Sequence, residues 1–226
     1  MKWQTSMIDL EKRVHNCEKC KKGKLRDVLP YPPVYSFGDP EGKELVIVGQ
    51  NPSTREFVNG FLVDGSDVEK RRQSQLTYFD RRNYLFFDEL ERFFEGKVRE
   101  KMHWVNSPWE KVGYLDIIKC PTRPFDGQGQ WSKLPQKMQR IIISNCEDYL
   151  IEQLSLYKPR IIIAYGADVG RWFSKHFNVS YEEFEDVTAQ LGSKRVDIIF
   201  IPQRQGPHSK PEVVWVQNKI LKVLMQ

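Results

Sequence analysis

Four short apolar runs, each closed by glycine or proline, recur along the chain. They are ELVIVGQ (44–50), GYLDIIKCP (113–121), PRIIIAYG (159–166) and RVDIIFIP (195–202). Runs that are rich in β-branched residues and do not alternate with polar positions are typical of strands buried on both faces, as the strands of a parallel sheet are. The pattern therefore predicts four strands of a central parallel sheet.

Amphipathic segments lie before, between and after these runs. Apolar residues recur at helical spacing in residues 1–16, 81–96, 137–158, 166–177 and 211–224. Strands that alternate with helices indicate an α/β sandwich around a parallel sheet. We expect one domain over residues 1–226, with the C-x-x-C segment at its N-terminal end.

Polar loops follow three of the predicted strands. GQNPS (49–53), CPTRP (120–124) and PQRQGPHS (202–209) all stand at carboxyl ends, where open α/β sheets bind their ligands. We therefore expect these loops to line one crevice. Residues 57–80, between the first two strands, are interpreted as a long functional loop because they carry aromatic residues among charges.

Composition narrows the class of protein without naming a partner. The 226 residues are 40% hydrophobic, enough to fill a core. The net charge of +5 is compatible with a polyanionic partner but does not establish one. No apolar run approaches the roughly 20 residues that span a bilayer, and the N-terminus carries no apolar signal segment. We expect a soluble, cytoplasmic monomer with no membrane partner.

The chain contains four cysteines, of which Cys17 and Cys20 form a C-x-x-C motif while Cys120 and Cys146 stand apart. In a reducing compartment such residues bind metal more often than they form disulfides. Four thiolates suit tetrahedral zinc or an iron–sulfur cluster. From spacing alone zinc is favoured, although only one C-x-x-C is present. The simpler interpretation is two buried free thiols and a chance C-x-x-C.

In chain order, these features resemble the uracil-DNA glycosylase superfamily, and most closely its iron–sulfur branch, family four. The resemblance spans residues 17 to about 224. It implies a three-layer α/β/α sandwich with a short central parallel sheet. It also implies a structural 4Fe–4S cluster rather than zinc, bound by Cys17, Cys20, Cys120 and Cys146. The matching features are the C-x-x-C, GQNPS, IIKCP, Cys146 on the next helix, YLIEQLSLYKPRIIIAYG, and the loop with His208 and Ser209.

The resemblance also implies a reaction. Such enzymes flip a base out of the DNA stack and hydrolyse its bond to the sugar with water. Asn51 matches the position that orients this water, and Gln50 would face the base edge. Phe57, or alternatively Phe61, would stack on the base, and Ser53 would bond a phosphate. An Asn in this motif is closer to the mismatch-specific thymine/uracil branch than to family four proper.

Asp116 departs from the family pattern. Family four carries an asparagine four residues before the cysteine, and that residue reads the uracil edge. An ionised aspartate only accepts hydrogen bonds, so it would lose one at uracil O4. We therefore expect Asp116 to disfavour uracil unless burial raises its pKa, and to suit a base with an exocyclic amine such as a cytosine. The alternative is that Asp116 faces a helix and pairs with a lysine or arginine.

The late loop places the proline before His208, whereas the superfamily motif reads His-Pro-Ser. The resemblance implies that His208 donates a hydrogen bond to the departing base while Ser209 and Lys210 contact phosphates. A solvated histidine without a catalytic role is the simpler interpretation. Basic residues near these loops would follow the DNA backbone. They are Arg55, Arg71, Arg72, Arg123, Arg204 and Lys210.

The leading interpretation is a monofunctional DNA glycosylase of base excision repair, without a lyase step because no catalytic lysine is obvious. One alternative is a nucleic-acid-binding protein of the same fold with altered catalysis. Another is a zinc-stabilised hydrolase of small nucleosides.

Overall fold

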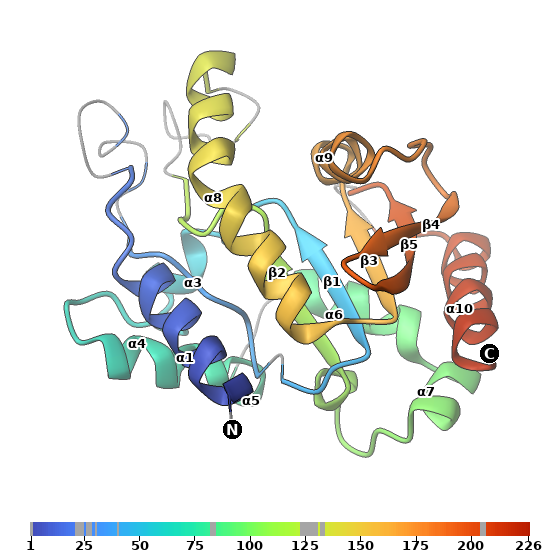
Figure 1. Ribbon diagram of the computed structural model, residues 1–226. Coiled ribbons are helices and arrows are strands. Elements are labelled where there is room, and N and C mark those ends of the chain that lie inside the picture. The colour runs from blue at the N-terminus through green and yellow to red at the C-terminus, as the bar shows by residue number, and fades with distance from the viewer. Residues whose placement is uncertain are drawn as a thin grey trace. The chain divides into compact units, whose positions relative to one another are not determined.

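A computed structural model describes residues 2–20, 25, 29, 31–39, 41–81, 85–122, 131, 134–203 and 207–226 (Figure 1). The chain divides into two compact units, each assembled from three segments. The first holds Met1–Asp39, Gln50–Arg81 and Leu115–Leu156, and the second holds Pro40–Gly49, Arg82–Tyr114 and Tyr157–Gln226. The expected single domain over residues 1–226 stays a prediction.

A five-stranded, mostly parallel sheet has the order β2-β1-β3-β5-β4. Strand β1 pairs in parallel with β3, and β3 pairs in parallel with β5, whereas β4 runs antiparallel to β5 (Figure 1). The predicted α/β class is therefore confirmed, as are the four predicted strands. The bounds are β1 Leu45–Gly49, β2 Val112–Asp116, β3 Ile161–Tyr165, β4 Asp186–Leu191 and β5 Lys194–Ile201.

Strand β4 was not predicted. Its residues are half-exposed along much of their length, so the strand lacks the continuous apolar run that marks the others. It joins β5 through a turn in which Gly192 has φ 61°, a left-handed conformation that glycine adopts without steric cost. An edge strand of this kind depends on pairing with β5 more than on its own hydrophobic pattern.

The helices of the second unit cover this sheet. Every residue of β1 and β3 is buried, which explains their uninterrupted apolar runs. Helix α9 (Ala167–Phe177) packs against β3 and β5, and α10 (Lys210–Leu224) packs against β5. The remaining helical segments of this unit are α6 (Leu85–Glu91), η1 (Arg92–Phe94), α7 (Lys97–Met102) and η2 (Pro108–Glu110).

The first unit contains helices where a loop was expected. Residues 57–80 contribute the end of α3 (Arg55–Val58), all of α4 (Val68–Leu76) and most of α5 (Tyr78–Arg81), so the prediction of a long loop is wrong. Helix α4 begins at a cap in which the Asp67 side chain accepts from the Lys70 N–H at 3.1 Å. Its sequence, VEKRRQSQL, is polar between the terminal Val68 and Leu76 and gives no apolar helical period.

Two long helices frame the N-terminal segment of this unit. Helix α1 (Lys2–His15) is joined to α8 (Gln136–Tyr157) by the ion pair of Arg13 with Glu152, and Lys19 Nζ donates to the Asn145 carbonyl at 3.0 Å. The fully buried Gln153 amide donates to the Tyr35 carbonyl at 2.8 Å. Helix α8 therefore holds both the C-x-x-C region and the segment after it.

The expected second strand is shorter than its apolar run. Strand β2 ends at Asp116, and Ile117–Cys120 forms a bend, so Cys120 follows the strand rather than ending it. In the part of the chain that the structure describes, no helix has both the length and the apolar character needed to cross a membrane.

We predict that Gly170→Ala destabilises the second unit. A Cβ at Gly170 would lie 2.1 Å from Tyr181 Cε2, and the Tyr181 ring packs edge-on against Phe200 at 5.2 Å. Overpacking of this kind costs about 1–3 kcal/mol, more than the roughly 1 kcal/mol that alanine gains over glycine in a helix. Chemical denaturation should show a lower free energy of unfolding. Lys175→Ala, at an exposed position of the same helix, is the control and should lose nothing.

Candidate active site and cysteine pocket

The GQNPS loop is tied to the segment that follows β2. The Ile118 N–H donates to the Gln50 carbonyl at 2.9 Å, one residue beyond the end of β1. Pro52 is buried, and its ring restricts φ of the backbone just after Asn51. The residues after two strands are thus held together within the first unit, as the sequence predicted for GQNPS and CPTRP.

The side chain of Asn51 is oriented by two acceptors. Its Nδ2 donates to the Pro52 carbonyl at 3.0 Å and to Thr122 Oγ1 at 3.1 Å. A carbonyl oxygen only accepts hydrogen bonds, so the nitrogen of the amide must be the atom that faces Pro52. The carbonyl oxygen Oδ1 of this half-buried side chain is consequently directed away from both partners.

Phe57 is buried and stacks on Tyr31, with ring centroids 4.7 Å apart and planes inclined by 12°. One face of the predicted base-stacking ring is therefore covered by a tyrosine that the sequence did not single out. The alternative candidate, Phe61, contacts Tyr78 edge-on at 6.3 Å. Ser53, predicted to bond phosphate, accepts from the Arg55 N–H at 3.2 Å and so helps to begin α3.

Asp116 lies at the end of β2 with 4% of its surface exposed. Among the described residues, its Oδ1 has no hydrogen-bond partner. Burial, together with the nearby Glu56 carboxylate, raises the pKa of Asp116 to about 8, although the charge of Lys119 opposes the shift. The condition under which this residue tolerates uracil, a pKa raised by burial, is therefore met.

Two charged neighbours of Asp116 were missed in the sequence. Lys119 is 1% exposed, and its Nζ donates to the Asp116 backbone carbonyl at 2.6 Å. Glu56 is 2% exposed and accepts from the hydroxyl of Tyr78 at 2.5 Å. The alternative expectation was that Asp116 pairs with a lysine or arginine. Among the described residues, the Asp116 and Lys119 side chains form no ion pair, and Lys119 is present only as a nearby positive charge.

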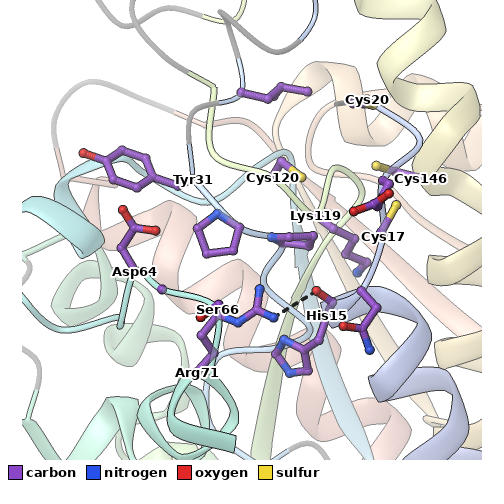
Figure 2. A pocket seen from close by; sticks show the side chains of 16 residues that line it. His15, Cys17, Cys20, Tyr31, Asp64, Ser66, Arg71, Lys119, Cys120 and Cys146 are labelled. Atoms are coloured by element: carbon purple, nitrogen blue, oxygen red, sulfur yellow. Dashed lines mark hydrogen bonds between the residues drawn. The ribbon is translucent and has the colours of Figure 1, made fainter. Parts of the chain in front are cut away.

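All four cysteines line one pocket of about 1030 Å³ in the first unit. They come from three separate segments and lie together on one side of the pocket, opposite Tyr31 and Asp64 (Figure 2). None of the four forms a disulfide, and Cys20 and Cys146 are buried. Spacing along the chain suggested a shared site, and the fold brings these cysteines to the same pocket.

The surroundings of the two buried thiols act in opposite directions on their charge. The Asn145 amide donates to Cys20 Sγ at 3.2 Å, which favours a charged sulfur, whereas burial raises the pKa of the Cys146 thiol to about 12 and favours its neutral form. Thiolates around one zinc ion would lie about 3.8 Å apart, given a Zn–S distance near 2.3 Å. Within the described ranges, no three cysteine, histidine or acidic side chains are gathered closely enough to hold a single metal ion.

Two of the basic residues expected to follow DNA have other contacts. Arg71 is 6% exposed, lines the cysteine pocket and donates to the His15 carbonyl at 3.2 Å (Figure 2). Arg72 pairs with Glu11 at 3.0 Å. Arg123 and Arg204 lie outside the described residues, so the predicted role of Arg204 in DNA binding stays a prediction.

The predicted His208 loop belongs to the second unit. His208 is 3% exposed, so the interpretation of a solvated histidine is wrong. Its ring lies beside Phe93, and its Nε2 is 3.5 Å from the Tyr165 hydroxyl. Ser209 begins α10, where the Glu212 carboxylate accepts from the Ser209 N–H at 2.7 Å, and Lys210 is exposed.

The structure thus brings together two groups of predicted residues in the first unit. One surrounds Asn51 and the other is the cysteine pocket. It adds Thr122, Lys119, Glu56 and Tyr31, which sequence reasoning did not assign. Only Lys119 carried a signal, as a lysine at the end of the apolar run LDIIKC. His208, Ser209 and Lys210 belong to the second unit.

A family model for the uracil DNA glycosylase superfamily matches residues 35–206 of the 226-residue chain. The matched range includes GQNPS, Asp116, Cys120 and Cys146, and it excludes Cys17, Cys20 and His208. No curated protein matches the chain.

We predict that Asp116→Asn stabilises the protein increasingly as pH rises from 5.5 to 7.5. The folded-state pKa of Asp116 is raised to about 8 from 3.8, so the folded chain retains a proton that the unfolded chain releases. Wild-type stability is therefore lost as pH rises through this window, by at most about 1.4 kcal/mol per pH unit from this group. The asparagine variant should lack that loss.

Denaturant unfolding of both proteins across this pH range measures the difference. The window stays below the pKa of Lys119, which burial lowers to about 8. Asp148→Asn on the exposed face of α8 is the matched control and should follow the wild type. A constant difference between Asp116→Asn and wild type at every pH would contradict the prediction.

Proposed function

Because the chain belongs to the uracil DNA glycosylase superfamily, we propose that it is a monofunctional DNA glycosylase of base excision repair. It hydrolyses the N-glycosidic bond of a flipped uracil or of another damaged or modified base. The observation that carries the proposal is the orientation of Asn51. Its amide nitrogen is held by Pro52 and Thr122, which leaves its oxygen to accept a hydrogen bond from water.

In the proposed reaction, DNA enters with the target base rotated out of the stack. The C1′–N bond breaks, and its electron pair leaves with the base. A water molecule held by Asn51 Oδ1 adds through its oxygen to C1′, and one of its protons is returned through solvent to the departing base. The neutral amide of Asn51 orients the water but does not take its proton, so it contributes mainly through positioning.

Asp116 supports uracil as a substrate within this proposal. Burial raises its pKa, so at neutral pH its carboxyl keeps a proton and both donates and accepts hydrogen bonds. In that state it offers the same pairing as the asparagine of the family pattern. The sequence suggested that an ionised Asp116 would lose a hydrogen bond at uracil O4. A protonated carboxyl can donate that hydrogen bond.

Further residues are proposed to act on the base and the backbone. In the first unit, Gln50 faces the base edge and Phe57 stacks on the base. A separate proposal concerns His208 of the second unit, which would donate to a base oxygen as negative charge develops. Ser53, Ser209, Lys210 and Arg204 contact phosphates. Lys119, a buried lysine among the described residues of the first unit, donates to the Asp116 carbonyl, and the proposal includes no covalent lyase step.

One observation favours the second candidate function, a nucleic-acid-binding protein with altered catalysis. Tyr31 covers one face of Phe57 at 4.7 Å, the kind of face on which a flipped base would stack. In this second function the chain keeps its DNA partner but excises no base. The two functions differ in one measurable respect, the formation of abasic sites.

We also propose that Cys17, Cys20, Cys120 and Cys146 hold a structural 4Fe–4S cluster, with zinc as the alternative. Support comes from four free thiols at one pocket and from the Asn145 donor to Cys20. When bound, the group crosslinks the N-terminal segment to the segment after β2 and to α8. The hydrolysis itself needs no electron transfer.

The test of activity is alkali cleavage after incubation with single- and double-stranded oligonucleotides. These would carry uracil, mismatched thymine, hypoxanthine, xanthine or modified cytosine. We expect abasic sites from one base, and a rate at least about 100-fold lower for Asn51→Ala because the water loses its acceptor. Asn59→Ala, an exposed asparagine after α3, is the matched control and should retain the wild-type rate.

DNA binding without abasic sites for any base would favour the second function. Equal activity of Asn51→Ala and Asn59→Ala would show that Asn51 does not orient the water. Circular dichroism of each variant checks that the loss is not caused by unfolding.

The test of the cluster is iron, sulfide and zinc analysis of protein purified without oxygen. We expect iron and sulfide in equal amounts, and their loss in Cys146→Ser because a buried ligand is removed. Ser144→Ala, exposed on the same helix, should keep both. Stoichiometric zinc without sulfide would show that the four cysteines bind zinc and not a cluster. The absence of both iron and zinc would favour the simpler interpretation of free thiols.

A further inference from the structure

Thr122 lies far from Asn51 in sequence but contacts its amide directly. It is 6% exposed and follows the bend after β2, two residues beyond Cys120. Its Oγ1 accepts from Asn51 Nδ2 at 3.1 Å across 71 positions of sequence. Nothing in its sequence position, within KCPT, sets it apart from an ordinary loop threonine.

The two acceptors of the Asn51 amide belong to different segments and restrain it in different ways. Pro52 is the next residue in the chain, so its carbonyl moves with the loop and fixes only which end of the amide faces inward. Thr122 belongs to another segment of the first unit, and the Ile118–Gln50 hydrogen bond of 2.9 Å ties that segment to the same loop. The hydroxyl of Thr122 therefore fixes the amide relative to a second part of the fold.

Orientation of this amide matters because its terminal torsion is intrinsically soft. The χ2 angle of asparagine is broad rather than confined to a narrow well. A catalytic group must be held within about 0.5 Å and 10–20° of its productive geometry, and a 1 Å misplacement can cost about 100-fold in rate. A second acceptor on Nδ2 narrows the directions in which Oδ1 can point.

We propose that Thr122 is a positioning residue, whose hydroxyl holds the Asn51 amide so that Oδ1 faces the hydrolytic water. The inference rests on the proposed glycosylase function. Because Thr122 is buried, it acts through Asn51 and not through contact with DNA. Its effect therefore falls on the rate of bond cleavage and spares the affinity for DNA.

Two substitutions separate the hydroxyl from the shape of the side chain. Thr122→Val keeps the size and the β-branch but removes the acceptor, and Thr122→Ser keeps the acceptor. We expect the single-turnover rate at saturating enzyme to fall about 10- to 100-fold in Thr122→Val and to stay within about threefold of wild type in Thr122→Ser. The dissociation constant for the same DNA and the melting temperature should stay near wild-type values in both.

A double-mutant cycle tests whether Thr122 acts through Asn51. In the Asn51→Ala background the amide is absent, so Thr122→Val should cause no further loss of rate. Full additivity of the two losses would overturn the proposal, because it would show that Thr122 acts elsewhere. A loss in Thr122→Ser as large as in Thr122→Val would also overturn it.

The rates of the wild type and of the two single variants separate the positioning role of Thr122 from the proposed glycosylase function. An active wild type that loses its rate in Asn51→Ala but not in Thr122→Val leaves the glycosylase intact and refutes only the positioning role. A wild type that forms no abasic site from any base refutes both.

Discussion

The hydrogen bond from Ile118 N–H to the Gln50 carbonyl is the constraint on which the candidate site depends. It joins the residues that follow β1 to the residues that follow β2, beyond the ends of both strands. It ties GQNPS to KCPT beyond the ends of the neighbouring strands β1 and β2. In the same region the Asn51 amide donates to Thr122 Oγ1 at 3.1 Å, which orients the side chain.

The same segment after β2 also carries the residues that connect the site to the cysteine pocket. Lys119 lines that pocket while its ammonium is bonded to the Asp116 carbonyl, and Cys120 follows directly. A group bound by the four cysteines would therefore restrain the backbone only two residues from Thr122. The proposed cluster and the proposed water site are in this sense parts of one loop, although only the second takes part in the reaction.

Buried charge gives this region its chemical character. Asp116, Glu56 and Lys119 are nearly or fully excluded from solvent, and burial of an ionised group is unfavourable unless it is paired. Tyr78 satisfies Glu56, and the Asp116 carbonyl satisfies Lys119, but the Asp116 carboxyl keeps an oxygen without a partner among the described side chains. That imbalance favours the protonated carboxyl, in keeping with the pKa of Asp116 that burial raises.

The sequence by itself determined the α/β class, four strands of the sheet and the grouping of Asn51 with the loops at strand ends. It did so because buried parallel strands need uninterrupted β-branched runs, which are visible in one dimension. Helix α4 was missed because only its two end residues are apolar, and strand β4 was missed because it lies half-exposed against β5. Only the tertiary structure decided that Tyr31 covers Phe57, that Asp116 and Lys119 are buried together, and that Thr122 holds Asn51. The first and the last depend on contacts between segments tens of residues apart, and the burial of Asp116 and Lys119, three residues apart, depends on the packing of other segments around them. No local pattern of residues encodes the distance between two side chains.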